Sequence, residues 1–171
     1  GSLMKHADVA MYLAKAKKQR YVVYDESKDY LASKRLKLLA RFEDALLGEE
    51  FELYYQPVFA SGDLPVYGFE ALLRWRQPDG SLMLAGEFIP QIEQTRFIGS
   101  LSRWVIKRAV KKLALLSGFE LDLSMNINLS AIDLQDETLA AYIKSCVDEY
   151  SVNPESLCFE VTETAIMFDL P

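Results

Sequence analysis

The sequence predicts an α/β fold whose sheet is mostly parallel and begins with an antiparallel pair of strands. From Phe51 onward, β-rich runs alternate with runs of helical periodicity, the pattern of parallel strands joined by crossover helices. Only residues 60–63, which include the turn residues 61–63, separate the first two β-rich runs, and so short a connection requires antiparallel strands. Half of the 171 residues are hydrophobic, which is enough for one domain core without disulfides.

Charge and cysteine content narrow the class of protein. The net charge of −6 argues against binding a nucleic acid polymer or an anionic membrane, so an anionic ligand would need a local site. Cys146 and Cys158 lack CxxC spacing and a histidine partner, so we expect buried, reduced thiols. We expect no signal peptide, and the sequence contains no apolar run of membrane-spanning length. We expect a cytoplasmic segment, even if a parent protein is membrane-anchored through other regions.

The N-terminal quarter of the chain is predicted to lie outside the main domain. Gly1-Ser2 is expected to be a cloning scar, and residues 3–25 are predicted to form a helix and then a strand at 20–24. Residues 26–50 follow as a linker helix, with leucines on one stripe and Gly48 as the stop. This helix carries movement between domains, or it packs as a cap on the downstream domain. The two roles are compatible.

The second β-rich run, residues 64–76, places a carboxylate and a guanidinium four residues apart among apolar side chains. Taken alone, the segment from Glu70 to Arg74 would also suit a helix with an ion pair. Pro65 and Pro78 bracket the run and leave too little room for a typical helix, which favours one buried strand. On a strand, Glu70, Leu72 and Arg74 alternate onto one face.

The remaining elements follow from the same two periodicities. We expect strands at 52–59, 121–130 and 157–161 and helices at 86–95, 100–117 and 135–150.

Oxygen-bearing side chains lie on three of these predicted strands. Asn128 and Glu160 fall near the C-terminal ends of parallel strands, where α/β proteins bind their ligands, and Glu70 lies on a third strand. A single such residue could be a strand-end cap. Three together favour a site for Mg²⁺ or Mn²⁺, which prefer oxygen ligands.

At this point the chain closely resembles the EAL-domain family, the cyclic di-GMP phosphodiesterases. The matching motifs occur in family order over residues 51–171: Tyr55-Gln56-Pro57-Val58, Glu70-Ala71-Leu72-Leu73-Arg74-Trp75, Glu87-Phe88-Ile89-Pro90, Asn128-Leu129-Ser130 and Glu160-Val161-Thr162-Glu163. The resemblance implies a TIM-like (β/α) barrel whose first strand is antiparallel, of which this chain holds the N-terminal half. It implies metal-dependent hydrolysis of cyclic di-GMP to linear pGpG at a site with two Mg²⁺ or Mn²⁺ ions.

The resemblance also implies roles for single residues. Glu70, Asn128 and Glu160 would be metal ligands, with Glu70 also catalytic. Glu163 would order an active-site loop and count with the catalytic residues. Gln56 would contact guanine, Arg74 a phosphate, and Leu72 the substrate.

Residues 7–15 resemble the last helix of GGDEF domains, so residues 3–25 are interpreted as the end of a GGDEF domain. Lys18-Gln19-Arg20 replaces the usual Gly-Arg-Asn turn of that family. The resemblance implies a GGDEF-EAL signalling parent that binds cyclic di-GMP and forms a homodimer. This segment is expected to contact neither a nucleic acid polymer nor a membrane.

The chain departs from the EAL pattern in packing positions and in extent. Ala85 stands where proline is usual, and Ile92 and Arg96 replace small residues, for which we expect consequences in packing. A complete barrel needs about 250 residues, so residues 51–171 are interpreted as a truncated domain that is inactive alone. The chain is then a fragment, or a second chain supplies the other half.

Three functions therefore remain open from the sequence. The parent is a phosphodiesterase, or a catalytically silent EAL module that acts as a cyclic di-GMP receptor. As a third alternative, the N-terminal helices serve only in dimerisation or docking. Every inspectable ligand position is filled, which favours the enzyme.

Overall fold

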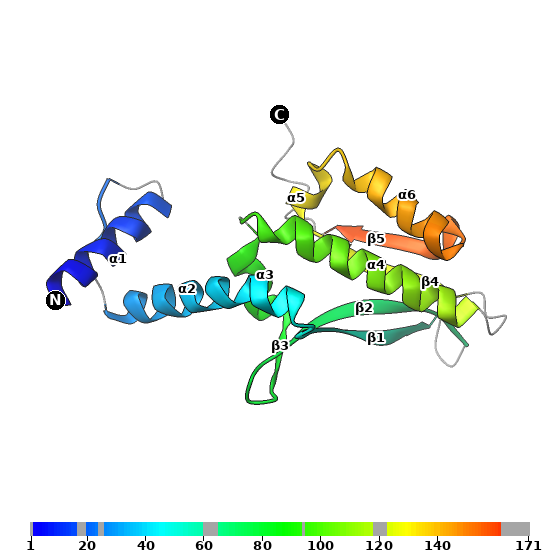
Figure 1. Ribbon diagram of the computed structural model, residues 1–171, viewed down its shortest axis with the longest axis horizontal. Helices are drawn as coiled ribbons and strands as arrows, with labels where there is room; N and C mark the ends of the chain where they lie inside the picture. The colour runs from blue at the N-terminus through cyan, green and yellow to red at the C-terminus, as the bar shows by residue number, and fades with distance from the viewer. Residues whose placement is uncertain are drawn as a thin grey trace. The chain divides into compact units, whose positions relative to one another are not determined.

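The computed structural model describes residues 2–16, 20–23, 26–59, 65–93, 95–117 and 123–161 (Figure 1). It divides into two compact units, residues 1–44 and 45–171, which are described separately below. None of the helices in the described part of the chain is long and apolar enough to cross a membrane.

The first unit is helical. It contains α1 (Ser2–Ala16) and most of α2 (Glu26–Leu47), in agreement with the two predicted helices. The strand predicted at 20–24 is wrong for its described part, because residues 20–23 form no strand. A β-rich run becomes a strand only when a second strand supplies hydrogen-bond partners, and the described part of the chain provides none for it.

The second unit is built on a mixed sheet in the order β1-β2-β4-β5, with β3 paired to the end of β2. β1 (Phe51–Phe59) and β2 (Val66–Arg76) are antiparallel, as the short connection predicts. β4 (Ser124–Leu129) and β5 (Leu157–Val161) continue the sheet in parallel, which confirms the α/β prediction.

The prediction missed β3 (Leu82–Leu84), which pairs with residues 74–76 of β2. Three residues are too few to show a periodicity, so only the hairpin turn could have indicated this strand. In that turn the Gln77 N–H donates to the Ser81 carbonyl oxygen at 2.8 Å. Gly80 has φ of +83°, a conformation that glycine adopts without strain.

The helices begin and end close to the predicted bounds, with one division that was not expected. They are α3 (Ala85–Ile92), α4 (Phe97–Ser117), α5 (Ala131–Leu134), α6 (Leu139–Tyr150) and a 3₁₀ turn at Pro154–Ser156. The helix predicted at 135–150 begins four residues later, because the chain first forms α5 and a turn in which the Leu139 N–H donates to the Asp136 carbonyl oxygen.

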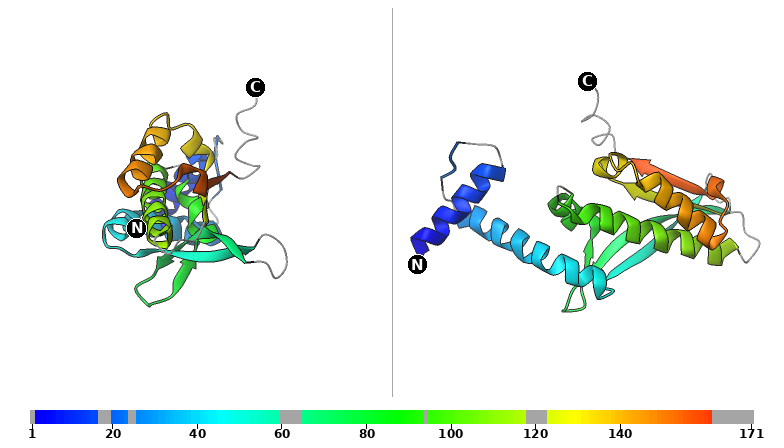
Figure 2. Two further views of the ribbon diagram at one scale, coloured as in Figure 1. Left: turned by 90° about the vertical axis from the view of Figure 1, so that its right-hand side faces the viewer. Right: turned by 45° about the horizontal axis from the view of Figure 1, so that its top comes forward.

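One face of the sheet is covered by helices, with α4 along it and α6 packed beside α4 (Figure 1, Figure 2). The side chains on this face are buried: Phe51, Ala71, Leu73, Trp75, Met125, Ile127 and Leu129. Near its edge, the Phe51 ring lies 5.1 Å from Trp75 and 5.8 Å from Phe88, centroid to centroid. Burial of this apolar face is the main driving force for folding of the unit.

Trp75 fixes the C-terminal end of β2 within this cluster. Its side chain is 1% exposed, and its Nε1–H donates to Glu50 Oε2 at 2.9 Å. A buried indole N–H needs such an acceptor. The end of the strand that carries Glu70 and Arg74 is therefore held by both packing and a hydrogen bond.

Candidate active site

The predicted site residues of the described chain all lie on the face of the sheet opposite the helices. Side chains alternate along a strand, and residues opposite each other in the register share a face. Gln56 pairs with Glu70 across β1 and β2, Glu70 pairs with Asn126 on β4, and Asn128 pairs with Glu160 on β5. Leu72 and Arg74 follow Glu70 on the same face of β2. This polar face is defined by Gln56, Glu70, Leu72, Arg74, Asn126, Asn128 and Glu160.

Glu70 and Asn128 are in direct contact. The Asn128 Nδ2–H donates to Glu70 Oε1 at 2.9 Å, although the two residues are 58 positions apart in the sequence. The parallel pairing of β2 and β4 makes this contact possible. Two of the three predicted metal ligands therefore occupy one small cluster.

Glu160 accepts a hydrogen bond from a residue that the sequence interpretation did not select. The Asn126 Nδ2–H donates to Glu160 Oε1 at 2.6 Å, and both side chains are partly buried. The sequence did indicate that Asn126 shares a face with Asn128, because it precedes Asn128 by two residues on a strand with clear alternation. Which carboxylate accepts from Asn126 depends on the strand register, which the local sequence pattern does not specify.

Arg74 lies on β2 with its guanidinium held at two points. Its Nη1–H donates to the Leu73 carbonyl oxygen at 2.9 Å, and its Cζ lies 5.8 Å from the centre of the Tyr54 ring. Tyr54 is exposed on the neighbouring strand, and its cation–π contact was not predicted from the sequence. Both contacts direct the arginine along the polar face without neutralising its charge.

The close approach of β2 and β4 requires a glycine. A Cβ atom at Gly68 would lie 2.1 Å from Ser124 Oγ and 2.8 Å from the Ser124 carbonyl oxygen. Gly68 and Ser124 are paired two residues before Glu70 and Asn126 and lie on the same face, so this glycine permits the close approach of the two strands that carry the site.

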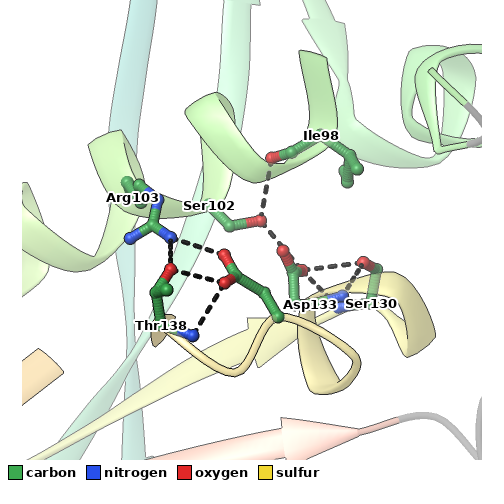
Figure 3. Close-up of polar contacts among 7 residues, drawn as sticks. Ile98, Ser102, Arg103, Ser130, Asp133 and Thr138 are labelled. Carbon is green, nitrogen blue, oxygen red and sulfur yellow. Dashed lines mark hydrogen bonds and ion pairs between the residues drawn. The ribbon is translucent and has the colours of Figure 1, made fainter. Parts of the chain in front are cut away.

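The loop after Asn128 is fixed by a buried hydrogen-bond network (Figure 3). Ser130 caps α5 in a reciprocal arrangement: the Asp133 N–H donates to Ser130 Oγ at 3.2 Å, and the Ser130 N–H donates to Asp133 Oδ2 at 2.8 Å. The same carboxylate accepts from the Ser102 hydroxyl of α4 at 2.8 Å. The serine of the Asn-Leu-Ser motif is thus a helix cap that anchors the end of β4.

An ion pair ties the following turn to α4 (Figure 3). Arg103 donates to Asp136, whose Oδ1 also accepts from the Thr138 N–H at 2.9 Å. Hydrogen bonds from Thr138, together with Arg103, lower the pKa of the Asp136 carboxyl below its usual range. The segment from Ser130 to Thr138 is therefore attached to α4 at two places.

The Glu-Phe-Ile-Pro motif also has a structural explanation. Glu87 Oε1 accepts from the Leu84 N–H at 2.9 Å at the start of α3, and Phe88 is fully buried. A cavity of about 290 Å³ lies beside this helix and is lined in part by Ala85, Leu72 and Asn128. The cavity adjoins two predicted site residues, so it offers space for part of a ligand next to them.

The donor set on the polar face is of the type that Mg²⁺ and Mn²⁺ use. Glu70 and Glu160 provide carboxylates and Asn128 an amide oxygen, and these hard ligands fit either ion. Among the described residues, no group of three or more His, Cys, Asp and Glu side chains gathers at one point. Further ligands would have to come from water, substrate or other residues. Glu163, the other predicted catalytic residue, lies outside the described residues.

The expectation that both cysteines are buried holds for Cys146 and is wrong for Cys158. Cys158 pairs with Asn126 in the register and so lies on the polar face, which no described helix covers. Cys146 is on α6, within the helical layer.

The fold and the site together define an α/β domain with an amide and carboxylate cluster on one face of its mixed sheet. The EAL domain family matches residues 39–170, which is most of the chain. This chain belongs to the EAL domain family.

The comparisons with individual proteins agree. The bifunctional diguanylate cyclase/cyclic di-GMP phosphodiesterase MucR of Pseudomonas aeruginosa is 34% identical over 169 residues, covering 98% of this chain and 25% of that protein. A structure described as the PaMucR phosphodiesterase in complex with c-di-GMP has a TM-score of 0.73 at 34% identity, covering 78% of this chain and 54% of that chain.

A second solved structure is the FimX EAL domain from Pseudomonas aeruginosa bound to c-di-GMP. Its TM-score is 0.67 at 29% identity, over 77% of this chain and 52% of that chain. The present chain thus spans about half of these solved domains and about a quarter of MucR.

Proposed function

We propose that this chain is the N-terminal part of an EAL phosphodiesterase domain that hydrolyses cyclic di-GMP to linear pGpG with Mg²⁺ or Mn²⁺. The observation that carries the proposal is the gathering of Glu70, Asn128 and Glu160 on one face of the sheet, next to Arg74 and Gln56. The relative MucR is named as a bifunctional diguanylate cyclase/cyclic di-GMP phosphodiesterase, and the PaMucR phosphodiesterase structure is a c-di-GMP complex.

The residues divide into metal-holding and substrate-holding groups. Glu70, Asn128 and Glu160 would hold a divalent cation, which when bound lowers the pKa of a water and stabilises charge on the phosphodiester. Arg74 would bind a nonreacting phosphate through its fork of N–H donors. Gln56 would hydrogen-bond a guanine edge, and Leu72 would pack against the ligand beside the cavity. Glu163 would order a neighbouring loop.

The rest of the proposal concerns the whole protein. We propose that it is a cytoplasmic GGDEF-EAL signalling protein and a homodimer, in which residues 3–25 end the GGDEF domain and residues 26–50 link the two domains. The 171-residue chain by itself would not turn over cyclic di-GMP, since two described carboxylates provide too few ligands for a two-metal site.

A silent EAL receptor is the alternative function. The FimX EAL domain was solved with c-di-GMP bound, and a bound ligand by itself requires no turnover. The residues on the polar face would serve binding equally well in that case.

A hydrolysis assay on the longer protein that contains this chain separates the two functions. With Mg²⁺ or Mn²⁺ in excess we expect conversion of cyclic di-GMP to pGpG. Chromatography of the nucleotides measures this conversion. Glu70→Ala should abolish conversion while the thermal unfolding temperature stays close to that of the parent protein. Binding of cyclic di-GMP without any conversion would establish the receptor instead, and normal conversion by Glu70→Ala would reduce Glu70 to a structural strand residue.

A further inference from the structure

We infer that Asn126 is a positioning residue that holds the Glu160 carboxylate in place for a divalent cation, an inference that rests on the proposed function. Asn126 stands outside the motifs by which the sequence was interpreted. It lies in the middle of β4, between the two strands that carry the glutamates of the site.

The two asparagines of β4 serve the two glutamates in a crossed pattern. In the register, Asn126 is opposite Glu70, yet it donates to Glu160 at 2.6 Å. Asn128 is opposite Glu160, yet it donates to Glu70 at 2.9 Å. Each carboxylate therefore receives an amide N–H from the asparagine diagonal to it and not from the one opposite it in the register. One diagonal contact joins β4 to β5, and the other joins β4 to β2.

This pattern assigns different tasks to the two amides. Asn128 would have to turn its amide oxygen toward a cation if it is to be a ligand, and Glu70 would then bind that cation too. Asn126 can keep its N–H on Glu160 Oε1 throughout, which leaves the other carboxylate oxygen, Oε2, available to the cation. Residues that fix ligand orientation in this way commonly change metal affinity by about 10–100-fold when they are removed.

The chemistry of the amide suits this task. An amide N–H stabilises a carboxylate without adding positive charge, so it does not repel an incoming cation as a lysine or arginine would. It also restricts rotation of the Glu160 side chain before the ion arrives, so less conformational entropy is lost on binding. If Asn126 had only a structural role, its substitution would change stability and leave the metal affinity unchanged.

The test measures Mn²⁺ affinity in the longer protein that contains this chain, from the electron paramagnetic resonance signal of the free ion. The key variant is Asn126→Leu, of similar size and without the donor, with Asn126→Ala as a second variant in case leucine impairs folding. Ser124→Ala is the matched control, because Ser124 lies on the same strand and the same face but does not donate to Glu160.

We expect both Asn126 variants to weaken Mn²⁺ binding about 10–100-fold, while Ser124→Ala leaves it within about twofold. In a double-mutant cycle, Asn126→Leu should have little further effect once Glu160 is replaced in Glu160→Ala, because this change removes the acceptor through which Asn126 acts. A purely structural residue would retain its full effect in that background.

Three results would overturn the inference: unchanged Mn²⁺ affinity in both variants, an undiminished effect in the Glu160→Ala background, or no Mn²⁺ binding by the parent protein. The readout does not include turnover. A parent protein that binds Mn²⁺ but does not hydrolyse cyclic di-GMP would contradict the proposed catalytic function and leave the comparison of affinities valid.

Discussion

The two faces of the sheet are made from the same strands and have opposite properties. On the helix-covered face, Trp75 and Ile127 are 1% and 0% exposed. On the polar face, the neighbours Arg74 and Asn128 are partly or largely exposed to solvent. Because side chains alternate, each step along a strand moves from a residue that stabilises the fold to one that is available for chemistry. Substitutions on adjacent residues can therefore separate the two tasks.

The largest effect on stability is expected at Trp75. Trp75→Ala removes ring contacts with Phe51 and Phe88 and the donor to Glu50, and should lower the free energy of unfolding by about 3–5 kcal/mol. Urea denaturation measures this change. Trp75→Phe keeps a ring and should lose less, and Gln56→Ala on the polar face should change little. Equal stability of Trp75→Ala and Gln56→Ala would contradict the division between the faces.

Adjacent leucines give the sharpest comparison. Leu73 is buried under the helices, so Leu73→Ala should cost about 2–5 kcal/mol of stability. Leu72 lies on the polar face beside the cavity, so Leu72→Ala should cost about 1 kcal/mol or less and should instead weaken cyclic di-GMP binding. Thermal unfolding and calorimetric titration, run on both variants, check the two parts. A reversed order of stabilities would mean that the strand faces are misassigned.

Arg74 tests the polar face alone. Arg74→Ala in the longer protein should weaken cyclic di-GMP binding about 10–100-fold, the range for a lost hydrogen bond to a charged group, and leave unfolding nearly unchanged. Arg74→Lys keeps the charge but loses the planar fork, so its affinity for cyclic di-GMP should lie between those of the parent protein and Arg74→Ala. Calorimetry gives the affinities. An unchanged affinity in Arg74→Ala would remove this residue from the substrate site.

The smallest effect is expected where the polar face ends, at Glu52 and Arg76. A hydrogen bond from Arg76 lowers the pKa of the Glu52 carboxyl, so this pair stabilises the folded state above the ordinary pKa and less as the pH falls. In Arg76→Gln, the pKa of Glu52 measured by NMR should rise toward its usual value. Asp79, whose pKa is lowered by Ser81, is the internal control and should not move. No rise at Glu52 would show that the pair does not persist in solution.

The sequence by itself determined the class of fold and most of the polar face. Alternation placed Glu70, Leu72 and Arg74 together, the short turn made the first strand pair antiparallel, and the motifs identified Gln56, Asn128 and Glu160. The alternation and the antiparallel pairing depend on local geometry, because a strand has a period of two and so short a connection cannot join parallel strands. The motif residues were identified through the resemblance to the EAL family.

Only the tertiary structure decided which of these side chains meet. The diagonal contacts from Asn126 to Glu160 and from Asn128 to Glu70 join residues that are 34 and 58 positions apart in the sequence, and they depend on the register between the strands. The same holds for the exposure of Cys158, the caps made by Ser130 and Asp133, and the lack of a strand among the described residues 20–23. Each depends on a partner brought near by the fold, and a local pattern carries no information about such a partner.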